Sequence, residues 1–252
     1  MEILNQKIQD LLNLFKSKKF KEAEILAKES VEKYPNNPFL YNFLGLILLE
    51  LKRYDEAIKI YRKGIKIDKN FSVFYNNLGI IYQSRKEYRK AKSFYEKAAK
   101  LEKKLPEANN NLGNLYRALN DDKKAIFFFK KAIDINSNFY PSHFNIGVLY
   151  KNIGNFDKAK FHLNEAIKIK PTLYTAHRNL SEITKYKENN DHLNLLKKIY
   201  EDKNNLINKK EICFALGKAF EDMKIYEKAF RYYNEGNNLH RSTINFSIKK
   251  EK

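Results

Sequence analysis

The sequence predicts an all-α fold built from repeated pairs of helices, and two observations lead to this prediction. Four glycines, Gly45, Gly79, Gly113 and Gly147, follow one another at intervals of 34 residues. Around each glycine, apolar or small residues recur every three or four positions, which is the pattern of a helix that buries one stripe. Because a fixed period of this length is the signature of a repeat architecture, we expect a stack of helical units.

Each repeat is expected to contain two helices, as the stretch YNNLGIIYQSRKEYRKAKSFYEKAA at residues 75–99 illustrates. The stripes of its first and second helices consist of Tyr75, Leu78, Gly79 and Tyr82, and of Ala91, Tyr95 and Ala98. Glycine and alanine leave room for a neighbouring backbone. We therefore expect these small residues at the points where two helices approach most closely.

The repeated frame resembles the tetratricopeptide repeat, a helix-turn-helix unit of 34 residues. The residues that carry the resemblance precede each glycine or open each second helix: Leu44, Leu78, Leu112, Ile146, Ala57, Ala91, Ala125 and Ala159. The resemblance implies an all-α, right-handed superhelix (α-solenoid) of about seven repeats. Gly64, which stands where the family has alanine, departs from the pattern.

Extending the frame predicts a single solenoid over residues 1–243, followed by a tail at 244–252. The predicted repeats are 4–37, 38–71, 72–105, 106–139, 140–173, 174–209 and 210–243. The sixth is degenerate because it lacks the alanines of the second helix, and an insertion is expected between Glu188 and Lys210.

Composition disfavours several classes of protein. The 49 Lys and Arg against 30 Asp and Glu give a net charge of +19, but the basic residues spread over helices and turns, which disfavours a nucleic-acid site. With Cys213 as the one cysteine, no intramolecular disulfide is expected, and a cytoplasmic location fits. The N-terminal stretch lacks the apolar run of a signal peptide or membrane anchor.

No catalytic residue, cofactor or metal site is expected. The histidines show no HExxH motif and no regular pairing along the sequence: His143, His162, His177, His192 and His240. His143, His177 and Cys213 fall in a slot that tyrosines fill in other repeats, so we expect them in the core. The chain is therefore predicted to be a non-enzyme.

A row of asparagines marks a candidate binding surface. If positions 4, 7, 8 and 11 of each repeat form the packing stripe, positions 2, 6, 9 and 13 face the other way and line a concave groove. Positions 6 and 9 carry Asn77, Asn111, Asn145, Asn179 and Asn114. Their carboxamides suit the N–H and C=O groups of an extended peptide. The pattern resembles the asparagine ladder in the repeats of O-linked N-acetylglucosamine transferases.

Asparagine also occurs off this register, at Asn42, Asn76 and Asn110, so a merely solvated face is the alternative. Further contacts are expected from Phe39, Phe43 and Leu46 and from Arg117, Lys151, Arg178 and Lys185. The four basic residues favour an acidic ligand. The preferred function is a non-catalytic scaffold that binds a protein or an extended peptide.

Two alternatives remain open. The last repeat, from Phe214 to Arg241, resembles the segment leading into the catalytic domain of bacterial proteins that join these repeats to a sulfotransferase. Membership would imply the donor 3'-phosphoadenosine 5'-phosphosulfate and a role in presenting an acceptor to a sulfotransferase or glycosyltransferase domain beyond Lys252. The third possibility is binding of RNA or a membrane through the basic surface, which predicts a steep loss of binding with salt.

Overall fold

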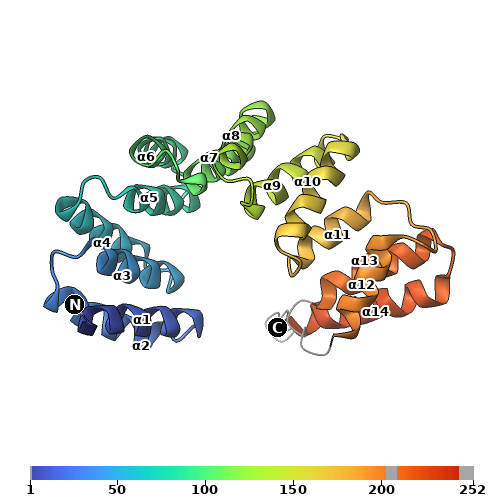
Figure 1. Cartoon of the computed structure of the whole chain (residues 1–252), viewed down its shortest axis with the longest axis horizontal. Coiled ribbons are helices and arrows are strands. Elements are labelled where there is room, and N and C mark those ends of the chain that lie inside the picture. The colour runs from blue at the N-terminus through green and yellow to red at the C-terminus, as the bar shows by residue number, and fades with distance from the viewer. Residues whose placement is uncertain (1, 203–208, 244–252) are drawn as a thin grey trace, which may run out of the picture. The chain divides into compact units, whose positions relative to one another are not determined.

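The computed structural model describes residues 2–202 and 209–243, and these residues form fourteen helices and no strand (Figure 1). The all-α prediction is therefore confirmed. The helices are α1 Glu2–Lys16, α2 Phe20–Lys33, α3 Pro38–Glu50, α4 Tyr54–Ile67, α5 Ser72–Ser84, α6 Tyr88–Leu101, α7 Pro106–Ala118, α8 Asp122–Ile135, α9 Tyr140–Asn152, α10 Phe156–Ile169, α11 Tyr174–Glu182, α12 Asp191–Glu201, α13 Lys209–Asp222 and α14 Tyr226–Thr243.

The helices belong to two compact units, residues 1–137 with α1–α8 and residues 138–252 with α9–α14. Within each unit, successive helices pack as pairs, for example α5 with α6 and α13 with α14. The second helix of a pair also contacts the first helix of the next pair in the same unit, as α4 contacts α5. That the two units form one solenoid over residues 1–243 stays a prediction, and the predicted tail, 244–252, lies outside the described residues.

The regularly spaced glycines let the two helices of a pair approach closely. A Cβ atom on Gly45 would lie 2.3 Å from the ring of Tyr61, and one on Gly113 would lie 2.5 Å from the ring of Phe129. Both rings are fully buried, and both belong to the second helix of the same pair. The expectation that these glycines mark the closest helix contacts is therefore confirmed.

One residue in the turn of most pairs adopts the left-handed backbone conformation. The φ angle lies between 58° and 79° at Lys18, Lys52, Lys86, Asn120, Gly154 and Lys224. In the third repeat, the N–H of Lys86 donates to the carbonyl of Gln83, and that of Glu87 donates to Tyr82, each at 2.9 Å. This pair of bonds closes the end of the first helix as a Schellman motif. Lysine adopts this conformation at a cost of about 1–2 kcal/mol, because its Cβ crowds the following carbonyl oxygen.

Lys86→Gly is expected to raise the free energy of unfolding by about 1 kcal/mol. Glycine relieves the strain at φ 60°, and its greater freedom in the unfolded chain offsets part of the gain. Urea unfolding followed by circular dichroism measures the change. The matched control is Lys63→Gly inside α4, where the same exchange should cost about 1 kcal/mol. A loss of stability in Lys86→Gly as well would contradict a strained turn.

Four helix pairs share a stack of two aromatic rings with a lysine over the first ring. The rings are Tyr82–Phe94, Tyr116–Phe128, Tyr150–His162 and Phe220–Tyr232, with centroids 5.3–5.8 Å apart. The ammonium groups lie 5.2–5.4 Å from the first ring in Lys90, Lys124, Lys158 and Lys228. A cation over a ring face is attracted by the ring quadrupole. Part of the lysine excess therefore has a structural role within the repeats.

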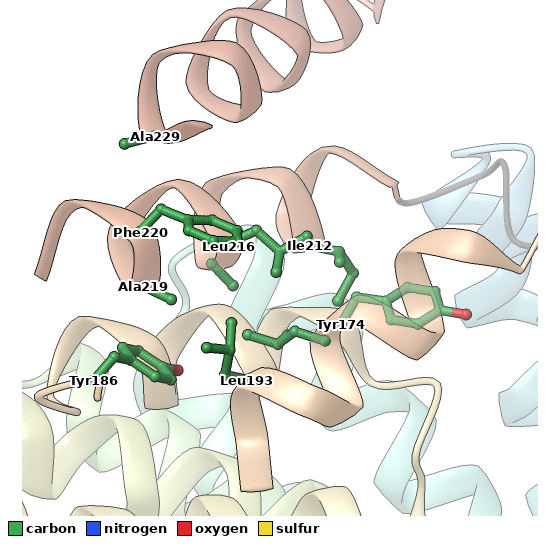
Figure 2. Close-up of a cluster of buried hydrophobic side chains, with 10 residues drawn as sticks. Tyr174, Tyr186, Leu193, Ile212, Leu216, Ala219, Phe220 and Ala229 are labelled. Carbon is green, nitrogen blue, oxygen red and sulfur yellow. The ribbon is translucent and has the colours of Figure 1, made fainter. Parts of the chain in front are cut away.

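The sixth repeat is irregular, as its sequence predicts. Its first helix, α11, has 9 residues where α5 has 13, and its second helix, α12, has 11 where α6 has 14. Both α11 and α12 pack on α13. In Figure 2 the buried cluster joins Leu193 of α12 and Tyr186 to Leu216 and Ala219 of α13. Residues 203–208, inside the expected insertion, lie outside the described part of the chain.

Candidate functional site

The first helices of the second, third and fourth repeats contain few charged residues. The charged residues of α3, α5 and α7 are only Glu50, Glu107 and Arg117. The second helices α4, α6 and α8 each carry an excess of Lys and Arg. Neutralising phosphates requires Lys and Arg, whereas carboxamides match peptide groups. The helices α3, α5 and α7 therefore offer few charges to phosphate groups and several carboxamides.

Two of the predicted asparagines bond to the preceding repeat. Asn77 Nδ2 donates to Asn42 Oδ1, and Asn111 Nδ2 donates to Asn76 Oδ1, each at 2.9 Å. Asn77 is only 4% exposed, so the expectation that position 6 faces away from the packing is wrong for this residue. The reason is that α5 also contacts the neighbouring first helices α3 and α7, so more than one stripe of it is buried. Position 5, which the sequence left without a role, supplies the acceptors.

Asn77→Ala is expected to lower the free energy of unfolding by about 1–2 kcal/mol. The change removes a buried hydrogen bond and leaves Asn42 Oδ1 without its donor. Chemical denaturation of Asn77→Ala, Asn42→Ala and the double variant completes a double-mutant cycle. The double variant should cost little more than either single change, whereas full additivity would mean that the bond adds no stability.

Asn114 and Arg117 are neighbours one turn apart on α7, beyond Asn111. Asn114 Oδ1 is buried and has no hydrogen-bond partner among the described residues, although the residue as a whole is partly exposed. Arg117 is half-buried, and among the described residues no carboxylate lies within ion-pair distance of it. Ile80, at the position of Asn114 one repeat earlier, is 40% exposed. Within the described residues, the Asn114 oxygen and the Arg117 guanidinium therefore have no partner, and the equivalent position one repeat earlier is an exposed apolar residue.

The predicted apolar contacts lie on α3. Phe39 is 55% exposed and meets the ring of Phe71 edge-on at 5.1 Å. It lines a cavity of about 420 Å³ together with Leu4, Tyr34 and residues 35–38. None of the predicted asparagines lines this cavity. Phe43 and Leu46 are half-buried.

In the second unit, several predicted groove residues bond to other groups of the unit. Lys151 Nζ donates to Asn179 Oδ1 at 2.7 Å and pairs with Glu182. Asn179 Nδ2 donates to the carbonyl of Thr175 at 2.8 Å. Asn145 is half-buried. The charge of Lys151 is therefore balanced within the chain.

Arg178 is also paired within this unit. Its guanidinium lies 4.6 Å from the ring centre of Phe214 and 3.0 Å from the carboxylate of Glu211. A small cavity of about 190 Å³ beside it is lined by Arg178, Ser181, Glu182, Phe214, Lys218 and Tyr233. Two cations, Arg178 and Lys218, and one anion, Glu182, line this cavity.

Lys185 pairs with Asp222 at 3.2 Å. Burial opposes ionisation of Asp222, but hydrogen bonds from Lys218, the Tyr186 N–H and Lys185 outweigh it and keep the pKa of this carboxyl below its usual range. Lys151, Arg178 and Lys185 therefore already have carboxylate partners in the chain. Four basic residues were predicted to attract an acidic ligand. Of these, Arg117 alone has no carboxylate within ion-pair distance among the described residues.

The structure pairs histidines that have no regular spacing in the sequence. His143 Nδ1 lies 3.2 Å from His162 Nδ1, and His177 Nδ1 lies 3.0 Å from His192 Nε2. His143 and His177 are buried, as their place in the tyrosine slot predicted. The 19-residue separation of His143 and His162 recurs between Tyr75 and Phe94, whose rings stack in the third repeat, so the repeat frame carries a signal for the first contact. The 15-residue separation of His177 and His192 has no such counterpart.

Neighbouring groups determine where the protons lie in the second pair. His177 Nε2 must donate to the carbonyl of Pro171 at 2.9 Å, since a carbonyl only accepts. Neutral His177 then accepts from His192 Nε2, and His192 Nδ1 accepts from the hydroxyl of Tyr186 at 2.6 Å. Burial lowers the pKa of both imidazoles, and with the nearby His177 it brings that of His192 to about 3. The chain of bonds ties α11 to α12.

Cys213 is fully buried, and burial raises the pKa of its thiol to about 12, which confirms its expected place in the core. In the ranges that the structure describes, no three potential metal ligands form a cluster. No described helix combines the length and apolar content that a bilayer-crossing segment requires.

Profiles described as tetratricopeptide repeats match residues 26–59, 45–86, 72–138 and 140–173. Together they span more than half of the chain, and the matches at 72–138 and 140–173 coincide with the helix pairs from α5 to α10. The chain therefore belongs to the tetratricopeptide repeat family. No curated protein sequence matches it.

Solved structures share the fold. A thermophilic protein of this family from Thermus thermophilus has a TM-score of 0.63 at 15% identity, over 71% of this chain and 98% of its own. PilF of Pseudomonas aeruginosa has a TM-score of 0.64 at 15% identity, over 94% and 97%. The Cut9–Hcn1 hetero-tetramer of the APC/C has 0.66 at 15% identity, over 92% of this chain and 42% of that one. At this identity the likeness concerns the fold alone.

Proposed function

We propose that the chain is a non-catalytic scaffold that binds an extended peptide segment of another protein along α5 and α7. The observation that carries the proposal is the carboxamide of Asn114, which makes no hydrogen bond within the described residues and leaves a buried oxygen unpaired. An unpaired buried acceptor costs about 1–3 kcal/mol. Rotation of this side chain toward a peptide N–H therefore recovers a bond without breaking another.

Three neighbours complete the proposed contact. Asn111 retains one N–H after donating to Asn76 and can donate it to a peptide carbonyl. Arg117 would pair with one acidic side chain of the ligand, and Ile80 would cover an apolar one. We expect about 1 kcal/mol from each of two neutral hydrogen bonds and about 2 kcal/mol from one charge-assisted bond. Apolar burial adds about 1 kcal/mol, so the total is roughly 5 kcal/mol. This corresponds to a Kd of roughly 0.2 mM, which suits a partner that exchanges readily.

The remaining predicted contacts stay predictions. Asn77 supports the proposed surface through its bond to Asn42, and the cavity at Phe39 is a candidate second anchor for the same ligand. Asn179, Lys151, Arg178 and Lys185 already bond to groups of their own unit and would contact a ligand through their remaining N–H groups. A contact of Asn145 stays a prediction as well.

The role of presenting an acceptor to a sulfotransferase or glycosyltransferase domain beyond Lys252 also stays a prediction. None of the four matching family profiles describes such an enzyme. A cytoplasmic location and the binding of RNA or a membrane also stay predictions.

A library of random twelve-residue peptides displayed on phage, selected on the whole protein, tests the proposal. The best peptide is then synthesised with a fluorophore, and its Kd is measured by fluorescence anisotropy. Asn114→Ala combined with Arg117→Ala should raise the Kd at least about tenfold, since more than 1.4 kcal/mol is removed. The matched control is Lys123→Ala with Lys130→Ala on the exposed side of α8, which should leave the Kd unchanged. Equal affinity in both variants, or no peptide enriched, would overturn the proposal.

A further inference from the structure

The last described helix repeats the sequence of α4. Residues 54–65 read YDEAIKIYRKGI, and residues 226–237 of α14 read YEKAFRYYNEGN. Tyrosine, alanine, tyrosine and glycine recur at four equivalent places, so the two helices can be compared position by position. In this comparison Ile58 corresponds to Phe230, and Ile65 corresponds to Asn237.

In the first unit, the outer side of α4 is covered by α5. A Cβ atom on Gly64 would lie 2.4 Å from the ring of Phe74, and Arg62 Nη2 donates to the hydroxyl of Tyr82 at 3.4 Å. Ile58 lies one turn before Arg62 on this side and is 8% exposed. The first helix of a following repeat is therefore what buries this surface.

On α14 no described residue covers the equivalent surface. Phe230 is 73% exposed and Tyr226, one turn earlier, is 65% exposed. Asn234 and Asn237, further along the same side, are also exposed. Full burial of a large apolar side chain is worth about 1.5–3 kcal/mol, so this aromatic pair is unfavourable in water and favourable in an interface.

The first helix of the first unit, α1, is built differently from α5. Phe74 and Ile81 of α5 are fully buried. Two repeat lengths earlier in the sequence, the equivalent residues of α1 are Gln6 and Asn13, and both are exposed. Polar residues thus replace the apolar ones at these two positions of α1. The α1 face of a second copy would bring polar side chains to Phe230, which excludes head-to-tail stacking of copies as the way to bury it.

We propose that the outer side of α14, marked by Tyr226 and Phe230, docks a helix of another protein. The argument is continuity with the interface between α4 and α5: the partner helix takes the place that α5 takes on α4. It must therefore present apolar residues spaced like Phe74, Leu78 and Ile81, at positions i, i+4 and i+7. This surface belongs to the second unit and is separate from the peptide contact proposed on α5 and α7.

The test uses a fluorescent, helix-stapled peptide with the sequence of α5, Ser72–Ser84, as a surrogate for the partner helix. Fluorescence anisotropy with the full chain should give saturable binding that Tyr226→Asn with Phe230→Asn weakens at least tenfold. The control is Phe127→Asn, which changes an exposed aromatic residue of α8 instead of α14. This variant should bind the peptide as tightly as the unaltered chain does. A peptide with asparagine in place of Phe74 and Ile81 should not bind.

Three results would overturn the proposal. The first is a lack of saturable binding, or equal affinity in the Tyr226→Asn, Phe230→Asn variant. The second is a dimer in sedimentation velocity that the same variant abolishes, because a second copy would then occupy the surface. The third is binding that appears only when the chain is shortened to end at Thr243, because residues 244–252 would then be the occupant.

Discussion

Gly113→Ala should lower the free energy of unfolding by about 2 kcal/mol, although alanine is the better helix former by about 1 kcal/mol. The added Cβ would lie 2.5 Å from two carbons of the Phe129 ring, closer than carbon atoms approach. Phe129 is fully buried, so its ring has no free space into which to move. Overpacking of this kind costs about 1–3 kcal/mol and outweighs the gain in helix propensity. Urea unfolding at neutral pH measures the change.

A second substitution separates the steric effect from other causes. The fifth repeat pairs Gly147 with Leu163, so leucine is compatible with the second-helix site. Phe129→Leu should therefore relieve part of the damage in a Gly113→Ala background, with a coupling energy of at least about 1 kcal/mol in the double-mutant cycle. Additive effects of the two changes would mean that contact with the ring is not what excludes a side chain at residue 113.

Acid should destabilise the second unit through His177 and His192. Both imidazoles are held neutral in the folded chain, and the pKa of His192 is about 3, against about 6.5 in an unfolded chain. Below about pH 6.5 the two imidazoles bind protons in the unfolded state but stay neutral in the folded state. The free energy of unfolding therefore falls as the pH falls. The stabilisation is complete above about pH 6.5, and lowering the pH to about 5 should remove about 2 kcal/mol through His192 alone.

Urea unfolding at about pH 7 and about pH 5 measures this loss. The control replaces both histidines, as His177→Tyr with His192→Leu. Tyrosine suits the first site because Tyr75, three periods earlier, donates to the carbonyl of Lys69 as His177 does to Pro171. This variant should lose less stability between the two pH values, whatever its stability at neutral pH. An unchanged pH dependence would show that the two imidazoles do not supply it.

Some features of the fold were predictable because a single residue type reveals them. A glycine that recurs with a fixed period marks a close helix contact, and Gly45 and Gly113 do lie against large rings. The left-handed turn residue was not predictable, since the site holds lysine in four repeats and glycine only at Gly154. Nor did the period reveal the two compact units, because it continues unchanged from Gly113 to Gly147 across their boundary.

The candidate site was predictable in part, for a related reason. A helical wheel places Asn77 away from one packing stripe but carries no information about the neighbouring first helices, which bury this residue against Asn42. The contact between His177 and His192 arises where α12 leaves the repeat frame, so comparison between repeats cannot find it. The sequence singled out Asn114 by its position, but only the structure reveals that its oxygen lacks a partner among the described residues.

The most direct test of peptide binding along α5 and α7 is the side-chain amide signal of Asn114 in a nitrogen-15 correlation spectrum. The signal is assigned by its absence in the Asn114→Ala variant, and the phage-selected peptide is added stepwise. We expect the Asn114 signal to shift with the peptide until binding saturates, while the signal of Asn237 on α14 stays unchanged. A saturating peptide that shifts other amide signals and leaves that of Asn114 in place would contradict the proposed function.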